Sequence, residues 1–103
     1  MVKVNVLYPN RSGTTFDMAY YLDHHIPMLQ RLLGPALKGV SVEQGISAAE
    51  PGSPAPYIAT GHLLFDSLPA FQRSFGPHAH EILEDIPKYT NSEPVIQIAE
   101  IKL

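Results

Sequence analysis

Residues 57–65, YIATGHLLF, are the stretch that decides the fold. They are rich in β-branched and aromatic residues and end at Asp66-Ser67, which predicts one long strand. Side chains of a strand alternate between its two faces. The odd-numbered positions form an apolar face that suits a protein core, whereas the even-numbered positions place Thr60 and His62 among apolar neighbours. The two faces of this strand therefore meet different surroundings.

Three further strands are predicted around this one. Alternating apolar residues predict strands over residues 2–8 and 95–101, and a weaker one over residues 38–44. Residues 45–56 contain two Gly and three Pro, so they predict a loop that is long for a connection between two strands.

Two helices are predicted from apolar residues at three- and four-residue spacing. The first ends at Gly34-Pro35, and Thr14-x-x-Asp17 resembles a capping box at its start. The second begins after Ser67 and is interrupted at Gly76-Pro77. The order β-α-β-β-α-β predicts an α+β, ferredoxin-like domain over residues 1–103, with both helices on one face of a four-stranded antiparallel sheet.

The composition limits the function. The chain has 103 residues, 45% of them hydrophobic and 17% charged, which indicates one globular domain. A net charge of -3 with scattered Lys and Arg argues against nucleic acid as a partner. The chain has no Cys, so disulfides, thiolate metal sites and thiol nucleophiles are excluded. No apolar run is long enough for a membrane span or a signal sequence, so we expect a cytoplasmic protein.

The sheet face turned away from the helices predicts a partner. By parity it carries Asn5, Thr60, His62 and Gln97 among mainly apolar residues, with few of the charges typical of a solvated face. Apolar surface of roughly several hundred Å² on a monomer marks an interface or a ligand site. We therefore expect a homodimer in which two sheets pack face to face around a cavity. A loosely amphipathic sheet open to water is the alternative.

Five motifs follow one another along nearly the whole chain. They are Val6-Leu7-Tyr8-Pro9, Phe16-Asp17-x-x-Tyr20-Tyr21 with His25-x-Pro27, Phe75-Gly76-Pro77-His78-Ala79, Ile86-Pro87-x-Tyr89-Thr90 and Glu93-Pro94-Val95-Ile96-Gln97. Together they resemble the EthD family, named for a protein linked to the degradation of ethyl tert-butyl ether. The resemblance implies a ferredoxin-like fold, dimeric α/β barrels and a role in the oxidative breakdown of small organic compounds. Members of the family are often described as reductases.

His25 is the strongest candidate for a catalytic residue. It shares the apolar face of the first helix with Leu22 and Leu29, whereas His24 lies about 100° away and is expected to be exposed. Pro27 lacks an amide hydrogen, so the helix should kink beside His25. Because the unperturbed pKa of histidine lies near neutrality, His25 suits an acid or base facing a cavity. A core histidine bonded to the backbone is the alternative.

Further residues are candidates for lining the cavity. His62 points by parity to the open sheet face, and we expect it to be catalytic or to orient a ligand. Ligand contacts are expected from Asn5, Thr60 and Gln97 beside it, and from Tyr20, Tyr21, His78 and Tyr89. Tyrosine rings suit the mouth of a pocket because they are apolar with a polar tip. His78, Glu81 and Asp85 share a helical face, where carboxylates could hold the histidine tautomer or merely form a solvated surface.

Cofactor motifs are not found. Helical metal ligands need a spacing of three or four, but His24 and His25 are adjacent and His78 and His80 are two apart. No metal site is therefore predicted. The glycines form no dinucleotide or triphosphate loop, so a reductase would need a partner to hold its nucleotide. No cofactor is predicted; haem held by a single histidine stays open, because related barrel families bind haem.

Two functions remain from these patterns. The first is a small homodimeric enzyme of oxidoreductase type that acts on a small apolar compound without its own nucleotide. The second is a non-catalytic module that binds or carries a hydrophobic intermediate, or supports a separate oxygenase or reductase. Variants of His25 would separate the two, because a carrier does not need an acid or base.

Overall fold

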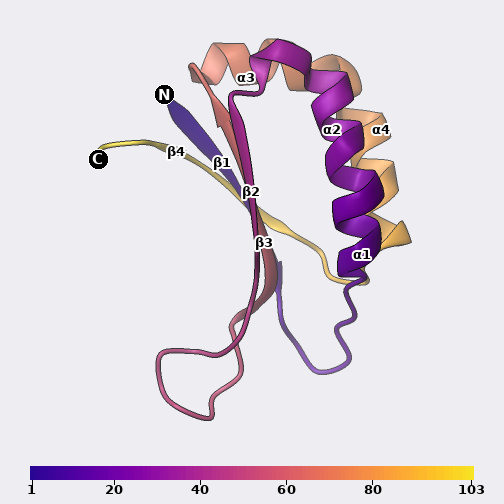
Figure 1. Cartoon of the computed structure of the whole chain (residues 1–103), viewed down its shortest axis with the longest axis vertical. Coiled ribbons are helices and arrows are strands. Elements are labelled where there is room, and N and C mark those ends of the chain that lie inside the picture. Colours follow the sequence, from indigo (N-terminus) through magenta and orange to yellow (C-terminus); the bar gives the residue numbers. More distant parts are fainter.

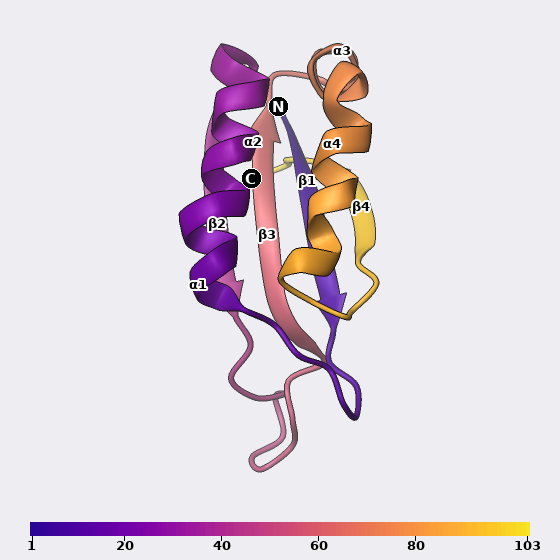
Figure 2. The ribbon, with the colours of Figure 1, turned by 90° about the vertical axis from the view of Figure 1, so that its right-hand side faces the viewer.

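A four-stranded antiparallel sheet forms one layer of the protein, and helices form the other. The computed structural model describes all 103 residues. The strands are β1 (Val2–Pro9), β2 (Gly39–Gln44), β3 (Tyr57–Phe65) and β4 (Val95–Glu100), and their order in the sheet is β2-β3-β1-β4. All helices cover the same face of this sheet (Figures 1 and 2). The predicted ferredoxin-like α+β fold is confirmed; the pairing of two such sheets stays a prediction.

The two faces of β3 differ as the sequence predicted. Burial alternates along the strand, and Ala59, Leu63 and Phe65 are buried on the helix side. In the central pair of strands Val4 lies opposite Leu63, and the neighbouring pair, Asn5 and His62, faces the other way. The core therefore lies entirely between the sheet and the helices.

The first helical segment changes its geometry along its length. It consists of α1 (Met18–Tyr20), a π-helical turn η1 (Tyr21–His25) and α2 (Ile26–Leu33), followed by the 3-10 turn η2 (Gly34–Ala36). The carboxylate of Asp17 caps the helix by accepting a hydrogen bond from the Tyr20 backbone N–H at 3.0 Å. The prediction that Thr14 begins a capping box is wrong, because its hydroxyl accepts from the backbone N–H of Arg11 within the preceding turn.

The second helical segment is interrupted where Gly76-Pro77 predicted it. It consists of α3 (Leu68–Phe75), η3 (Gly76–His78), α4 (Ala79–Asp85) and η4 (Ile86–Lys88). The predicted N-cap is confirmed, because the Ser67 hydroxyl accepts from the Ala70 backbone N–H at 3.1 Å. No helix of the protein has both the length and the apolar character that crossing a lipid bilayer requires.

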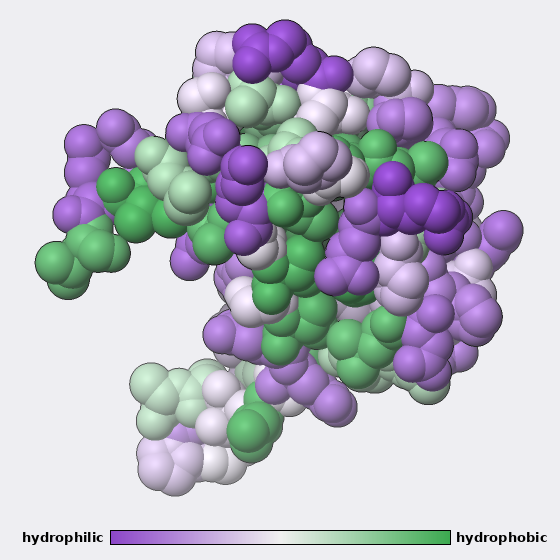
Figure 3. All heavy atoms as spheres, turned by 45° about the horizontal axis from the view of Figure 1, so that its top comes forward, coloured by the Kyte–Doolittle hydropathy of each residue, from purple (hydrophilic) through white to green (hydrophobic).

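The sheet face opposite the helices is uncovered. The loop of residues 45–56 and the C-terminal residues both project beyond the sheet on this side, away from the helices (Figure 1). In the space-filling view a hollow separates the two projections, and hydrophobic side chains gather beside it (Figure 3). Ile46 in the loop and Leu103 at the C-terminus are 93% and 116% exposed, so neither packs against its own chain.

Candidate functional site

A small apolar cavity lies between the sheet and the helices. It has a volume of about 70 Å³. One water needs roughly 10–15 Å³ on this scale, so the cavity has room for a few waters or one small ring. Its lining is Val4, Val6, Tyr8, Tyr21, His25, Leu29, Gly61, Leu63, Phe71, Phe75, Ile82, Leu83, Ile86 and Ile96. Only the tyrosine hydroxyls and the imidazole bring polar atoms to this lining.

The π-helical turn η1 places two of these polar groups one above the other. It ends directly before Ile26-Pro27, and the Ile26 backbone N–H bonds to the Tyr21 carbonyl. The disruption that Pro27 predicted therefore takes the form of a π-helical turn, a geometry often found at functional sites. The rings of Tyr21 and His25 stack with centroids 5.5 Å apart and an interplanar angle of 14°. Both side chains thereby face the cavity, and His24 is exposed.

Asp85 at the end of α4 fixes the orientation of His25. The distance from its Oδ2 to Nδ1 of His25 is 2.8 Å, and the Tyr20 hydroxyl donates to Oδ1 at 2.8 Å. An ionised carboxylate only accepts hydrogen bonds, so Nδ1 carries the imidazole proton and Nε2 has the lone pair. The hydrogen-bonding partner of Nε2 is the Tyr89 hydroxyl at 3.5 Å, a distance too long for a strong hydrogen bond. His25 is therefore arranged as a base.

The hydroxyls of three tyrosines meet at the same end of the cavity. Those of Tyr8 and Tyr89 are 2.6 Å apart and either can be the donor. The Tyr21 hydroxyl lies over Gly61, where any Cβ would collide with it. Gly61 is thus required for the position of Tyr21. The result is a cluster of hydroxyl donors beside the imidazole.

Burial sets the protonation of these groups. It lowers the pKa of His25, and the Asp85 carboxylate opposes this only in part, so the imidazole is neutral near pH 7. Burial acts to raise the pKa of Asp85, but hydrogen bonds from His25 and Tyr20 outweigh it and keep the carboxyl ionised. Burial raises the pKa of Tyr8, Tyr21 and Tyr89 above the usual range of tyrosine. Their hydroxyls stay protonated and available as donors.

The cavity opens between α4 and the edge strand β4. Leu83 and Ile96 belong to its lining yet are 47% and 49% exposed. Ile96 faces the helices, as the sequence predicted, but the helices cover β4 only in part. The exposed part of the lining is thus apolar, whereas the residues that carry polar atoms, Tyr8, Tyr21 and His25, are buried.

The chain connections hold the tyrosine end in place. The Asp17 backbone N–H donates to the Tyr89 carbonyl at 2.7 Å, and the Thr90 hydroxyl donates to the Thr15 carbonyl at 2.7 Å. These bonds fasten the start of α1 to the segment that precedes β4. Both sides of the hydroxyl cluster are therefore part of one framework.

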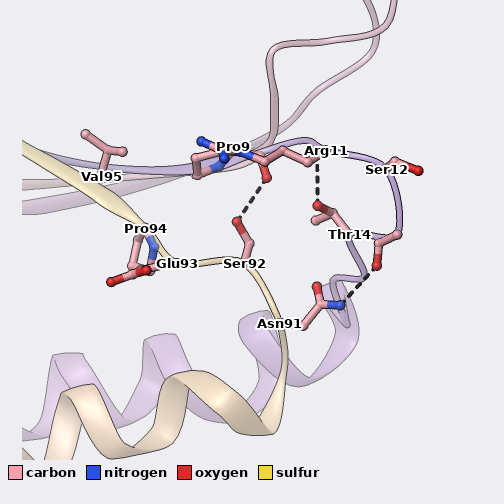
Figure 4. A pocket seen from close by; sticks show the side chains of 10 residues that line it. Pro9, Arg11, Ser12, Thr14, Asn91, Ser92, Glu93, Pro94 and Val95 are labelled. Atoms are coloured by element: carbon pink, nitrogen blue, oxygen red, sulfur yellow. Dashed lines mark hydrogen bonds between the residues drawn. The ribbon is translucent and has the colours of Figure 1, made fainter.

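A larger, open cleft lies beside this framework (Figure 4). It measures about 540 Å³ and is lined mainly by polar residues of the turn after β1 and the segment before β4. Several of its polar groups bond to one another: the Ser92 hydroxyl donates to the Pro9 carbonyl at 2.9 Å, and the Asn91 amide to the Gly13 carbonyl at 3.0 Å (Figure 4). These groups are satisfied within the chain, so the cleft is a weaker candidate than the cavity.

The predicted site residues divide between the two faces of the sheet. Tyr21 and His25 line the cavity, while Tyr20 and Tyr89 support it through Asp85 and Tyr8. A second cluster lies on the open face. It consists of Asn5, whose Oδ1 is 2.7 Å from His62 Nδ1, Thr60, 3.0 Å from His62 Nε2, and Gln97 opposite Asn5. The sequence interpretation assumed that His25 and His62 line one cavity. This is wrong, because the two side chains lie on opposite faces of the sheet.

Two residues of the site have roles that the sequence did not predict. The sequence left open whether Asp85 holds the tautomer of His78 or belongs to a solvated face, but Asp85 pairs with His25 instead. Tyr8, which the sequence analysis did not single out, is almost fully buried and lines the cavity. The contact between Asp85 and His25 depends on how two helices pack, so helical spacing gave no signal for it. No group of three or more His, Asp or Glu lies close enough to hold a metal ion.

The fold and the cavity define the class of the protein: a ferredoxin-like α+β domain with a histidine-containing apolar chamber between sheet and helices. The family model of the EthD domain matches residues 14–93. The chain belongs to the EthD family, as the sequence motifs indicated. Among proteins with curated descriptions, none matches.

Solved structures agree with this assignment. An EthD-like protein from Ralstonia eutropha JMP134 is 40% identical, with a TM-score of 0.94 over 99% of this chain and 92% of that one. An ethyl tert-butyl ether degradation (EthD) family protein from Bacillus halodurans C-125 shares 19% identity and a TM-score of 0.74 over 99% of both chains. A protein from Arabidopsis thaliana, 16% identical, shares the fold with a TM-score of 0.71 over 100% of this chain and 97% of that one.

Proposed function

We propose that this protein binds a small apolar organic compound in the cavity between sheet and helices, and that His25 acts there as an acid or base. The observation that carries the proposal is the pairing of His25 with Asp85 at the only polar end of an apolar chamber. Burial and hydrogen bonding leave Nε2 unprotonated next to the space where a ligand would lie. The family resemblance suggests oxidative breakdown of such a compound as the setting, with a separate oxygenase or reductase as partner.

We further propose that the protein is a homodimer whose open sheet faces meet. The support is the uncovered sheet face, flanked by two projections with the exposed apolar residues Ile46 and Leu103. In such a dimer, His62 belongs to the interface and not to the chamber with His25. Its bonds to Asn5 and Thr60 would satisfy its ring nitrogens when water is excluded.

A carrier function is the second candidate. It is favoured by the lining of the cavity, which is apolar everywhere except at its inner end. A carrier and an enzyme share the binding step, so binding is the first property to test. They differ in the step after binding: an enzyme needs the His25 side chain for turnover, whereas a carrier does not.

Toluene is a suitable probe of the binding step. In NMR titrations of methyl-labelled protein, we expect shifts at the cavity-lining methyl groups of Leu29, Leu63 and Ile82, and none at the exposed Ile46. Shifts confined to exposed methyl groups, or no saturable shifts, would contradict the proposal.

A pair of variants tests the route by which toluene enters the cavity. Leu83 at the mouth is 47% exposed, and so is Leu22 on the first helical segment, which the sequence wrongly placed on the buried face with His25. Leu83→Trp should slow the exchange of toluene, because the larger side chain narrows the mouth. Leu22→Trp adds the same side chain away from the mouth and should leave the exchange unchanged. Equal effects of the two variants would count against this entry route.

A further inference from the structure

Tyrosine hydroxyls and a base meet at one end of the cavity, and their protons can be arranged in more than one way. Tyr8 and Tyr89 form one hydrogen bond, which uses the proton of only one of them. The Tyr21 hydroxyl lies against Gly61 at the cavity wall. A base, His25 Nε2, lies 3.5 Å from the Tyr89 hydroxyl. Donors and a base at one end of an apolar chamber are complementary to an acidic O–H group that can become an anion.

We propose that the ligand is a small phenol, bound with its oxygen at the hydroxyls of Tyr8 and Tyr21 and converted there to the phenolate by His25. This inference rests on the proposed function, because it names the class of compound that the cavity takes. The phenolic O–H bond breaks, its proton moves to Nε2, and the electron pair stays on the phenolate oxygen. No oxidant or co-reactant is required for this step.

The hydrogen-bond network supports both states of the site. With the cavity empty, the Tyr8 hydroxyl can donate to Tyr89, and Tyr89 can point towards Nε2. With a phenol bound, Tyr89 can donate to Tyr8 instead, which frees the Tyr8 proton for the ligand oxygen and Nε2 for the ligand proton. The reversal needs only rotation of two hydroxyls, which costs little reorganisation.

The charges after proton transfer are also accommodated. The imidazolium of His25 would lie between the Asp85 carboxylate and the phenolate, so each charge has an opposite neighbour. Burial raises the pKa of both tyrosines that face the ligand oxygen, so they donate and do not compete for the proton. The apolar lining and the volume of about 70 Å³ suit a single ring.

The expected shift in the pKa of the bound phenol is the sum of opposing contributions. Desolvation of the bound phenolate raises the pKa of the ligand, whereas each donated hydrogen bond and the imidazolium lower it. With two hydroxyl donors and one cation, we expect the pKa of the bound phenol to lie about one unit below that of the free phenol. Removal of one donor should cancel most of this shift.

The probe for this proposal is 4-nitrophenol, because its phenolate absorbs visible light. The pKa of the bound probe is measured by titration with the wild-type protein in excess. We expect it to lie about one unit below that of the free probe. Tyr21→Phe should bring the bound pKa up to the free value or above it. Tyr57→Phe changes a tyrosine that does not line the cavity and should behave as the wild type.

Toluene titration of the same variants separates the possible failures. If toluene binds in the cavity but 4-nitrophenol binds only as the neutral phenol, or Tyr21→Phe leaves its pKa unchanged, the phenol proposal is overturned and the proposed binding function stands. If neither toluene nor 4-nitrophenol binds, both the proposed binding function and the phenol proposal are overturned. Toluene binding by Tyr21→Phe is the control. It shows that the variant is folded, so that a lost shift in the pKa of bound 4-nitrophenol is due to the missing hydroxyl.

Discussion

Nδ1 of His25 and Oδ2 of Asp85 lie 2.8 Å apart, although the two residues are 60 positions apart in the sequence. One lies in the π-helical turn before Pro27 and the other at the end of α4. The carboxylate determines which imidazole nitrogen carries the proton and therefore which one can act as a base. The two helical segments thus create the chemical character of the site only when they pack together.

Replacement of Asp85 by Asn should change the tautomer of His25. The amide of Asn keeps the size of the side chain but can donate to Nδ1, which would move the imidazole proton to Nε2. We expect ¹⁵N NMR of the histidine side chains to show this change, together with a loss of roughly 1–3 kcal/mol in the free energy of unfolding. Glu81→Gln, on the exposed surface of α4, is the matched control. An unchanged Nδ1–H tautomer in Asp85→Asn would contradict the assigned role.

The stability of the protein should fall in acid in two separate ranges. Burial lowers the pKa of His25 below its ordinary value of 6.5 in the native state, so below about pH 6.5 the unfolded chain binds a proton that the native protein does not. Acid therefore favours unfolding, with a slope of at most about 1.4 kcal/mol per pH unit from this group. The pKa of Asp85 is also lowered, from 3.8, so its contribution is lost only below about pH 4.

Denaturant unfolding between pH 7.5 and pH 5 tests the histidine contribution. His25→Gln should flatten the dependence of the unfolding free energy on pH in this range, whatever its effect at pH 7.5. His24→Gln, which changes the exposed neighbour on the same helical turn, should retain the slope of the wild type. A slope that persists in His25→Gln would assign the acid sensitivity to other groups.

The sequence was sufficient for the fold because local signals agree with one another. The alternation in residues 57–65 predicted which face of β3 is buried, and Ser67 and Gly76-Pro77 marked the start and the interruption of the second helical segment. These features depend on near neighbours in the chain. The first helix is the exception, since Asp17 and not Thr14 provides its N-cap. Both residues have suitable side chains, and only the path of the turn after β1 decides between them.

The site was predicted only in part, because its contacts join distant segments. Helical spacing identified His25 as buried, and strand parity placed His62 on the opposite sheet face. Spacing within one helix could not show that Asp85 reaches His25. The collision that a Cβ at Gly61 would cause with the Tyr21 hydroxyl is a tertiary contact as well. Pro27 gave the one local signal for the π-helical turn, without specifying its geometry.

A charge on the open sheet face should prevent dimer formation without unfolding the chain. Thr60→Lys places an ammonium group on the central strand β3, where the proposed interface would bury it in both copies. The cost of an uncompensated buried charge, about 3 kcal/mol or more, corresponds to at least roughly a hundredfold weaker association. Sedimentation of the wild type should give twice the chain mass of 11.3 kDa, and Thr60→Lys should give the single-chain mass. Gln72→Lys, on the exposed side of α3, should remain dimeric.

Gly61 and Tyr21 should behave as a coupled pair. A Cβ at position 61 collides with the Tyr21 hydroxyl but is only in ordinary contact, 3.6 Å, with the ring carbon Cζ. Gly61→Ala should therefore destabilise the wild type by roughly 1–3 kcal/mol, as expected for an overpacked core. In Tyr21→Phe the collision is absent, and Ala is favoured over Gly within a strand by about 0.5–1 kcal/mol, so the same substitution should be neutral or stabilising. A double-mutant cycle by denaturant unfolding measures this change of sign. Additive effects of the two substitutions would show that the hydroxyl does not occupy the space above Gly61.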